Sequence, residues 1–307
     1  MPELPEVETV ARTLAPDVCG RRIETMTVLE PRSWQGGTSA AAIARHHPII
    51  QAVSRRGKLL LLHFGGAAGA PAGCGATWPA CYTREGMQSG RPPLAGSTPD
   101  EVTGLAIHLR MTGGLFPQPR GASAQKHTRL IIDLDDGTRV FFNDMRKFGS
   151  ARAISGRELA AWDFWKELGP DPLEMSVEAF CTAMLASGRQ IKSLLLDQGT
   201  IAGVGNIYAA ESLFAAGIRP DARGCDISPE RLKKLHCVLR EILLEAIREC
   251  GSTISDYRNA HGDAGSFQNH FRVYGRGGLP CHGCGSILLS ARIGGRGTVW
   301  CPNCQKP

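Results

Sequence analysis

The chain has 307 residues, of which 42% are hydrophobic, and its 35 Lys and Arg against 29 Asp and Glu give a formal net charge of +6. This length suffices for two or three domains with ordinary cores. No run of about 18 apolar residues predicts a membrane span, and the N-terminus lacks the basic and apolar regions of a signal peptide. The charge is only mildly basic, so a nucleic-acid surface would require local clustering of Lys and Arg.

Residues 3–15 predict an amphipathic helix, because apolar side chains recur at helical spacing. These side chains are Val7, Val10, Ala11 and Leu14. Glu3 and Glu6 are either ordinary helix-start acids, favoured by the helix dipole, or partners of a terminal nucleophile. If Met1 is removed, Pro2 becomes a secondary amine, and amines form Schiff bases with aldehydic carbon.

The segment after this helix is predicted to be mainly β. Apolar and β-branched runs predict strands at residues 58–64, 104–109, 129–134 and 139–142, with Asp136-Gly137 as a hairpin turn. Residues 65–103 break this pattern and are rich in Gly, Ala, Pro and Ser, so we expect an exposed insertion. A redox or metal role for its Cys74 and Cys81 is the less favoured interpretation.

The second half is predicted to be helical. Helices are expected at residues 176–186, 190–196, 206–215 and 229–250, the last with an amphipathic stripe. Between the second and third of these, Gly203-Val204-Gly205 precedes Asn206. Such a turn at a helix start presents backbone N–H groups to an anion, although it also occurs without any ligand. Lys192 is a nearby cation that can share a phosphate.

The C-terminal segment, from about residue 271, predicts a metal site on a β-hairpin. Two Cys-x₂-Cys pairs supply four thiolates at the spacing of a zinc ribbon, namely Cys281, Cys284, Cys301 and Cys304. Four thiolates leave no open coordination position, so we expect one structural Zn²⁺. The hairpin between the pairs carries Arg292 and Arg296, and Arg at such a tip suits contact with phosphate. The other seven of the 11 cysteines are scattered, which disfavours a disulfide framework and indicates a reducing compartment.

Four of these motifs together resemble the formamidopyrimidine-DNA glycosylase family. They are residues 1–9 (MPELPEVET), residues 203–217 (GVGNIYAAESLFAAG), residues 267–276 with Phe-Gln leading to Val-Tyr-Gly-Arg, and the closing zinc ribbon. The resemblance covers nearly the whole chain outside the insertion. It implies an α+β multidomain protein: a catalytic β-sandwich domain with a leading helix (residues 1–154), a helix–two-turn–helix domain (155–270) and a zinc-finger hairpin (271–307).

The resemblance also implies a catalytic set. Pro2 is the nucleophile that attacks the anomeric carbon of the damaged nucleotide, and Glu3 protonates the sugar ring oxygen as the ring opens. Glu6 orients the terminus, and Lys58 lies near the lesion and its phosphate. The resulting cationic iminium is an electron sink that promotes β- and then δ-elimination, so the enzyme is expected to be a bifunctional glycosylase and abasic-site lyase.

Extrusion of the target nucleotide requires side chains that fill the gap in the duplex. The family's wedge residues correspond to Met111, Arg146 and Phe148, with Arg146 bonding the orphaned base. The resemblance further assigns phosphate contacts to His127, Asn206 and Arg296, in addition to Lys192. The intact wedge favours oxidised purines, such as 8-oxoguanine and formamidopyrimidines, over the oxidised pyrimidines taken by the sibling endonuclease VIII group.

Two departures from the family pattern are visible. Arg110 stands where glycine is usual, and the match of the loop at residues 260–268, expected to cover the flipped base, is loose. The third alternative is a catalytically silent protein that binds damaged DNA, but every catalytic position holds the expected residue type. We therefore expect a base-excision repair enzyme acting as a monomer on double-stranded DNA with oxidised bases or abasic sites, in the bacterial cytoplasm at the nucleoid and away from membranes.

Overall fold

A computed structural model of the chain describes residues 1–65, 98, 100–254 and 257–307. Most of the predicted insertion, including Cys74 and Cys81, therefore lies outside the described residues. The described chain divides into two compact units: the first holds residues 1–2, 6–166 and 253–265, and the second holds residues 3–5, 167–252 and 266–307. Each unit is described by itself.

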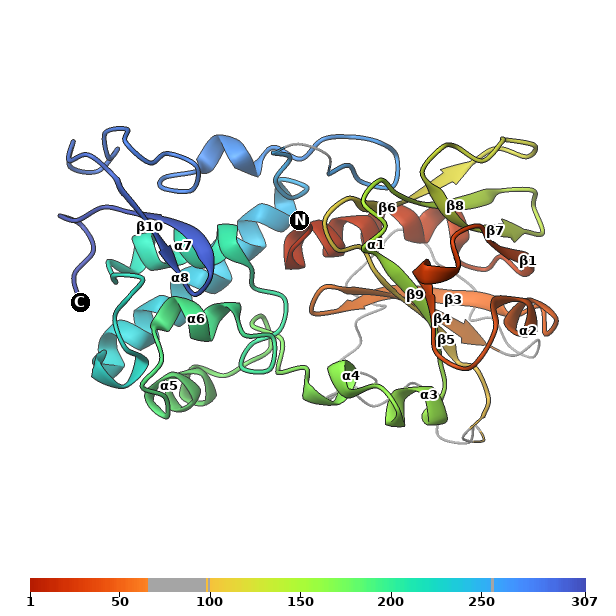
Figure 1. Ribbon diagram of the computed structural model, residues 1–307, viewed down its shortest axis with the longest axis horizontal. Helices are drawn as coiled ribbons and strands as arrows, with labels where there is room; N and C mark the ends of the chain where they lie inside the picture. The colour runs from red at the N-terminus through yellow and green to blue at the C-terminus, as the bar shows by residue number, and fades with distance from the viewer. Residues whose placement is uncertain (66–97, 99, 255–256) are drawn as a thin grey trace. The chain divides into compact units, whose positions relative to one another are not determined.

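The first unit is a β-sandwich with a leading helix (Figure 1). Its helices are α1 (Leu4–Val18), α2 (Ala40–Ala44), α3 (Gly156–Ala160) and α4 (Asp163–Glu167), with a 3₁₀ turn at Pro31–Ser33. Its strands are β1 (Ile23–Val28), β2 (Trp34–Gln35), β3 (Ile49–Arg56), β4 (Leu59–Gly65), β5 (Gly104–His108), β6 (Gly113–Gln118), β7 (Thr128–Leu134), β8 (Arg139–Asp144) and β9 (Ser150–Ile154). The strands form one sheet in the order β1-β7-β8-β6 and another in the order β2-β9-β5-β4-β3.

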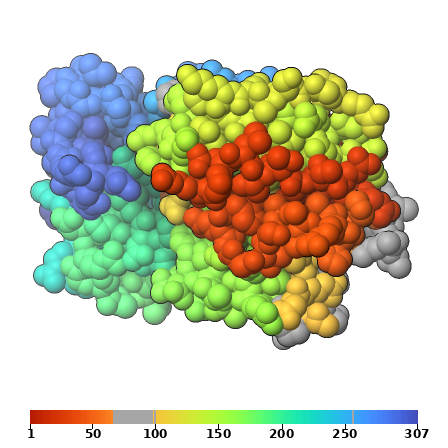
Figure 2. Space-filling model, turned by 45° about the vertical axis from the view of Figure 1, so that its right-hand side comes forward, coloured from red at the N-terminus to blue at the C-terminus, as the bar shows by residue number. Residues whose placement is uncertain are grey.

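One hydrophobic core joins both sheets to α1. Alternate residues of the strands, such as Ile132 and Leu60, pack with Val10 and Leu14 of α1. The pairing also brings distant segments together, since β1 is antiparallel to β7. Figure 2 shows the consequence at the surface of this unit, where the N-terminal segment (red to orange) borders the segment that contains β6 to β8 (yellow to yellow-green).

The predicted elements of this unit are confirmed, with shifts at their ends. The Asp136-Gly137 turn closes the β7–β8 hairpin, and Gly137 has a φ of 90°, in the left-handed region. The predicted end of the first helix at residue 15 was wrong, because α1 continues through Pro16 to Val18. Proline costs one helical hydrogen bond there, whereas Val18 is 1% exposed in the core, so packing outweighs the loss.

The second unit is helical and ends in a β-hairpin. Its elements are α5 (Val177–Leu185), α6 (Ile191–Leu196), α7 (Asn206–Ala216), α8 (Pro229–Arg248), β10 (Leu289–Ile293) and β11 (Arg296–Trp300), with 3₁₀ turns at Gly224–Asp226 and Phe267–His270. Each predicted helix is present, and Ser176 and Ser228 cap α5 and α8 through their side-chain oxygens. Within the described residues, no helix combines the length and apolarity that crossing a membrane requires.

Candidate active site and nucleic-acid interface

The N-terminal acids have different partners. Pro2 is buried two residues before the first residue of α1. In the first unit, the Glu6 carbonyl accepts a hydrogen bond from the Tyr257 hydroxyl at 3.2 Å. Glu8 is 4% exposed and pairs with Arg55 at 2.9 Å. Glu8 is therefore held in a buried ion pair, which leaves Glu3 and Glu6 as the acids whose roles the N-terminal motif predicts.

Lys58 lies in the tight turn between β3 and β4. Arg56 pairs with Leu59, so the turn consists of Gly57 and Lys58, and Gly57 has a φ of 57°. Lys58 is 6% exposed. Burial lowers the pKa of His108 on the neighbouring strand to about 3, and the charges of Arg110 and Lys58 act in the same direction. His108 therefore stays neutral near a lysine whose ammonium group is largely withdrawn from solvent.

The three wedge residues lie in two turns that one carboxylate connects. Asp144 is fully buried; its Oδ1 accepts the Thr112 hydroxyl and, at 3.2 Å, the Arg146 N–H, and its Oδ2 accepts the Gly149 N–H at 2.7 Å. Thr112 follows Met111, and Gly149 follows Phe148. Asp144 thus links the turn that carries Met111 to the turn that carries Arg146 and Phe148.

The wedge side chains themselves face solvent. Met111 is 39% exposed and Phe148 is 54% exposed, so both turns present a large apolar side chain at the surface. The Arg146 guanidinium lies 4.9 Å from the centre of the Phe148 ring. Arg110 and Lys147 have φ values of 55° and 58°. One non-glycine residue in the left-handed region therefore precedes Met111 and another lies between Arg146 and Phe148, and such strain is concentrated at functional sites.

His127 lies beside the same turn. Its carbonyl accepts a hydrogen bond from the Asp144 N–H at 2.9 Å, and the residue is half-buried. The first unit therefore brings the predicted phosphate contact next to the base of the wedge. Asp144, which organises this region, was not singled out by the sequence; a carboxylate two residues before Arg146 is the signal that would have found it.

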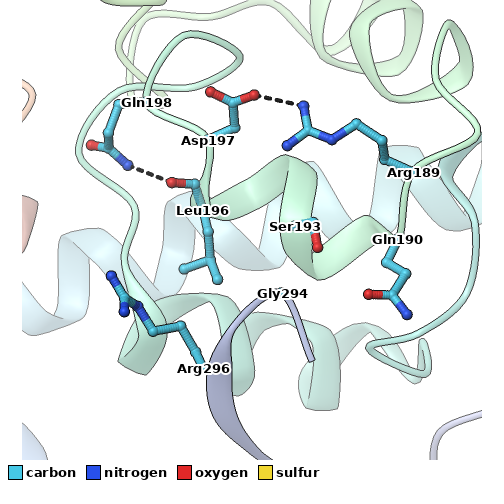
Figure 3. A pocket seen from close by; sticks show the side chains of 8 residues that line it. All are labelled: Arg189, Gln190, Ser193, Leu196, Asp197, Gln198, Gly294 and Arg296. Carbon is cyan, nitrogen blue, oxygen red and sulfur yellow. Dashed lines mark hydrogen bonds and ion pairs between the residues drawn. The ribbon is translucent and has the colours of Figure 1, made fainter. Parts of the chain in front are cut away.

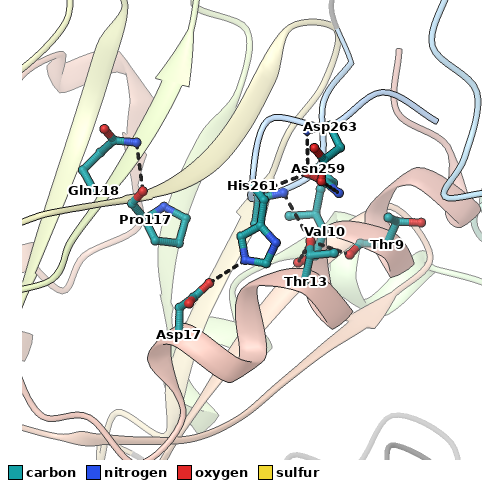
Figure 4. A network of polar contacts seen from close by, with 10 residues as sticks. Thr9, Val10, Thr13, Asp17, Pro117, Gln118, Asn259, His261 and Asp263 are labelled. Carbon is teal, nitrogen blue, oxygen red and sulfur yellow. Dashed lines mark hydrogen bonds and ion pairs between the residues drawn. The ribbon is translucent and has the colours of Figure 1, made fainter.

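Residues 259–263 form a compact turn on α1 (Figure 4). The Ala260 N–H donates to Thr13 Oγ1 at 3.2 Å, and His261 Nε2 lies 3.0 Å from Asp17 Oδ2. Asn259 Oδ1 accepts the N–H groups of His261 and Asp263, both at 2.9 Å, and this fixes the turn. The first part of the loop expected to cover the flipped base is therefore fastened to the helix that follows Pro2.

In the second unit, the Glu3 carboxylate lies at the N-terminus of α7. Its Oε1 accepts the Ile207 N–H at 3.0 Å, and its Oε2 lies 3.5 Å from the Tyr208 nitrogen. Glu3 is 2% exposed. The sequence predicted that the Gly-x-Gly turn presents its N–H groups to an anion, and in the structure these two N–H groups are directed at the chain's own Glu3.

Both glycines of that turn allow this close approach. The Leu4 N–H donates to the Gly203 carbonyl at 3.0 Å, and Gly203 has a φ of 92°. A Cβ at Gly203 would lie 2.9 Å from Leu4 Cβ, and a Cβ at Gly205 would overlap the carboxyl group of Glu3. The turn therefore requires glycine because residues 3 and 4 pack directly on its backbone.

The predicted phosphate-binding residues of this unit surround the start of β11. Asn206 Nδ2 donates to the Gly297 carbonyl at 3.1 Å, and Lys192 Nζ donates to Thr298 Oγ1 at 2.7 Å. Lys192 is fully buried, and burial lowers its pKa to about 8, against an opposing effect of the Glu3 charge. Arg296, by contrast, is exposed at the first position of β11. Lys192 and Asn206 thus fix the backbone beside Arg296.

Glu211 is a second buried acid that the sequence did not indicate. It is 3% exposed and accepts the N–H groups of Arg272, Val273 and Tyr274 at 2.9, 3.0 and 2.7 Å. Burial raises its pKa, although these three hydrogen bonds act in the opposite direction. Glu211 thereby holds the segment that leads into the zinc hairpin against α7.

The four predicted metal ligands converge at the base of the β10–β11 hairpin. Their sulfur atoms all lie within 4.8 Å of one another. Cys281 and Cys304 are 3.9 Å apart and Cys284 and Cys301 are 3.4 Å apart, measured between Sγ atoms. Tetrahedral Zn²⁺ with Zn–S bonds of about 2.3 Å separates its sulfurs by roughly 3.8 Å. The residues therefore fit one structural zinc ion, which would join the two Cys pairs and stabilise the hairpin.

Comparison with known protein families matches three segments of the chain. Residues 1–151 match the formamidopyrimidine-DNA glycosylase N-terminal domain, residues 168–258 match the H2TH domain of the same glycosylase, and residues 278–307 match a zinc finger found in FPG and IleRS. Formamidopyrimidine-DNA glycosylase of Nitratidesulfovibrio vulgaris is 45% identical, with 100% of each chain covered. That of Chloroflexus aurantiacus is 39% identical over 99% of this chain and 98% of the relative.

Solved structures agree with these matches. A Lactococcus lactis FPG mutant in complex with Fapy-dG containing DNA superimposes with a TM-score of 0.80 at 31% identity, covering 100% of both chains. The MutM (FPG) protein from Thermus thermophilus gives a TM-score of 0.78 at 35% identity, also over 100% of both chains. The sequence matches and the fold together show that the chain belongs to the formamidopyrimidine-DNA glycosylase family.

Proposed function

We propose that this protein is a bifunctional base-excision repair enzyme that removes oxidised purines from double-stranded DNA and cleaves the strand at the resulting site. The observation that carries the proposal is the environment of Glu3, next to Pro2 in the chain. Two backbone N–H groups of α7 hold its carboxylate in place, on a turn whose glycines admit it. The names of the relatives support the substrate class.

The first chemical step is nucleophilic substitution at the sugar. With Met1 removed, the Pro2 nitrogen attacks the anomeric carbon, and the purine departs with the electron pair of the glycosidic bond. Glu3 takes up the proton that the Pro2 amine loses on attack and donates it to the ring oxygen as the ring opens, which leaves a cationic iminium between Pro2 and the sugar. Positioned acid catalysis of this kind contributes roughly 10²–10⁴ in rate. Glu6 is assigned the orientation of the terminus.

The second step is strand cleavage. The iminium withdraws electrons, so the adjacent sugar carbon loses a proton and the 3′ phosphate leaves by β-elimination. A second elimination releases the 5′ phosphate, and hydrolysis of the imine returns Pro2. This lyase activity follows from the choice of a proline nucleophile, because its imine always carries a positive charge.

The remaining residues bind and distort the DNA. Met111 and Phe148 are exposed on turns that buried Asp144 connects, which suits insertion into a base stack, and Arg146 has donors for the orphaned base. Lys58 and His127 in the first unit, and Asn206 and Arg296 in the second, are assigned to the backbone around the lesion. Lys192, which was predicted to share a phosphate, is fully buried and bonded to Thr298, so it is assigned to fixing the start of β11 beside Arg296. Because the substrate is the bacterial chromosome, we place the protein at the nucleoid in the cytoplasm.

Borohydride trapping tests the proposal. The purified protein, with removal of Met1 verified by intact mass, is incubated with an 8-oxoguanine:C duplex and borohydride, and the cross-linked peptide is mapped. We expect an adduct at Pro2. Pro2→Gly should lose trapping and base release while DNA binding is retained. Near-normal turnover of Pro2→Gly would refute the nucleophile, and a strong preference for a dihydrouracil duplex would refute the substrate class.

A further inference from the structure

The second unit contains a cavity of about 780 Å³ between the segment around α6 and the tip of the β10–β11 hairpin (Figure 3). Arg189, Asp197 and Gln198 line it from the α6 side, and Arg296 lines it from the hairpin. Of these residues, only Arg296 is assigned a role in the proposed function. Arg189 is therefore a cation in the lining of the cavity that has no role in the proposed function.

The lining indicates an anionic ligand rather than a small organic molecule. Pockets for organic ligands are lined mainly by hydrophobic and aromatic side chains. Here, among the residues that the structure describes, Leu196 is the one apolar residue with a long side chain that lines the cavity, and no aromatic residue lines it. Figure 3 shows the Arg189 guanidinium directed at Asp197, with Leu196 between it and the Arg296 guanidinium in this view. Planar guanidinium groups with several donors suit phosphate oxygens.

The two arginines differ in how they are held. Arg189 Nη1 donates to Asp197 Oδ2 at 2.7 Å, and its side chain is 54% exposed. The hydrogen bond from Arg189 lowers the pKa of Asp197, so this carboxylate is ionised at neutral pH. Asp197 Oδ1 also accepts the Gly199 N–H at 3.0 Å. Asp197 thus fixes the direction of Arg189 and offsets part of its charge, whereas in the described part of the chain the Arg296 guanidinium has no such acid.

The cavity wall is continuous with the turn that receives Glu3. Gln198 Nε2 donates to the carbonyls of Leu196 and Val204, both at 2.9 Å. Gln198 Oε1 accepts the Gly203 N–H at 3.0 Å. Gln198 therefore joins the wall of the cavity to the turn whose helix start orients the Glu3 carboxylate.

We propose that this cavity receives a backbone phosphodiester of the DNA substrate, with Arg189 as a second cationic ligand opposite Arg296 and Asp197 as the acid that sets its direction and strength. The inference rests on the proposed function, since it names a further phosphate site on the same substrate. Asp197 keeps the site weaker than two free arginines would make it. Exposed cations bind any duplex, so this restraint limits binding to undamaged DNA.

Opposite effects of two substitutions test the site. Affinity for a duplex with a stable abasic analogue is measured over a range of salt concentrations. Arg189→Ala should weaken binding about three- to tenfold and reduce the log–log salt slope by roughly 0.9, the value for one phosphate contact. Asp197→Asn keeps an oxygen for the Gly199 N–H but removes the charge, so it should strengthen binding about threefold. Arg189→Lys should keep most of the salt slope.

A matched ion pair supplies the control. Arg219 and Asp221 form another partly exposed pair in the same unit and do not line the cavity. Arg219→Ala and Asp221→Asn should leave the salt slope unchanged, and melting curves verify that all variants fold. If Arg189→Ala matches Arg219→Ala, or if Asp197→Asn weakens binding as Arg189→Ala does, the pair is only structural and the phosphate site is refuted. Trapping at Pro2 by the unaltered protein remains a separate result, so failure of this site is distinguishable from failure of the proposed function.

Discussion

Two turns, one in each unit, are organised by a buried carboxylate, and they differ in where that carboxylate comes from. In the first unit, Asp144 binds the N–H groups of Arg146 and Gly149, two and five residues away. In the second unit, Glu3 binds the Ile207 N–H, 204 residues away. Each turn also contains a glycine at a crowded position: a Cβ at Gly149 would lie 2.6 Å from Phe142 Cζ and 3.1 Å from Asp144 Oδ2, and a Cβ at Gly205 would overlap Glu3.

Asp144 makes contacts that are local in the sequence, whereas Glu3 makes a tertiary contact between distant parts of the chain. Asp144 shapes its own turn so that Arg146 and Phe148 face solvent, and damage to it should change the presentation of the wedge. Glu3 is itself a proposed catalytic group, and the N–H groups that follow the second turn hold its carboxylate. Substitutions in the turn that holds Glu3 should therefore lower mainly the rate of base release. Substitutions in the Asp144 turn should lower stability and the extrusion of the base.

The largest effect is expected for Gly205→Ala. The backbone at Gly205 is compatible with alanine, with a φ of −131°, so the new methyl group acts only by displacing the Glu3 carboxylate. Misplacing a catalytic group by about 1 Å costs about 10²-fold. We expect single-turnover base release to fall by about that factor while binding to an abasic-analogue duplex changes little.

A second glycine provides the control for this substitution. Within the described part of the chain, a Cβ at Gly37 would meet only Glu158 Oε1, at an ordinary contact distance of 3.5 Å. Gly37→Ala should therefore retain full activity. If Gly205→Ala keeps normal base release, the position of Glu3 is not critical and the contrast between the two turns disappears.

An intermediate effect is expected for Asp144→Asn. The amide replaces one acceptor oxygen by a donor, so at least one of the N–H or hydroxyl groups now paired with Asp144 loses its partner in a buried site. Such a loss costs about 1–3 kcal/mol. Denaturant unfolding should show this destabilisation, and excision from a duplex should fall more than excision from a single strand, where no base needs extrusion.

The exposed neighbour Asp135 serves as the comparison, because Asp135→Asn removes a charge from the same unit without a buried network. If Asp135→Asn lowers stability as much as Asp144→Asn does, the effect comes from the change in net charge. An equal loss of activity on duplex and single strand would remove the assignment of Asp144 to the wedge.

The same contrast explains what the sequence could predict. Periodicity identified α8 and the β7–β8 hairpin, because an apolar stripe and an Asp-Gly turn depend on neighbouring residues. The Cys pairs identified the metal site because the ligand spacing is local within each pair. The motif at residues 203–205 was visible, but a Gly-x-Gly pattern cannot tell which anion it receives, and that partner was Glu3.

Side-chain burial was equally hidden in the sequence. Lys192 was expected to share a phosphate, and nothing near it in the sequence indicates that its ammonium reaches Thr298, 106 residues away. The same holds for Glu211 and residues 272–274. These contacts depend on how α6, α7 and the hairpin pack, and packing is a property of the whole unit rather than of a window of sequence.

The smallest effect is expected from the titration of Lys192, the fully buried cation beside the turn that holds Glu3. The wedge turn differs in that its cations, Arg146 and Lys147, are exposed. Burial lowers the pKa of Lys192 from 10.5 to about 8. Between these values the unfolded chain holds more protons than the folded chain, so stability rises with pH. Relative to Lys192→Met, the free energy of unfolding of the unaltered protein should increase by about 1 kcal/mol from about pH 7 to pH 9. Equilibrium denaturation of both proteins at each pH measures this difference. A relative stability that falls over the same interval would mean that the charged lysine is favoured in the folded state, and it would refute the effect of burial on Lys192.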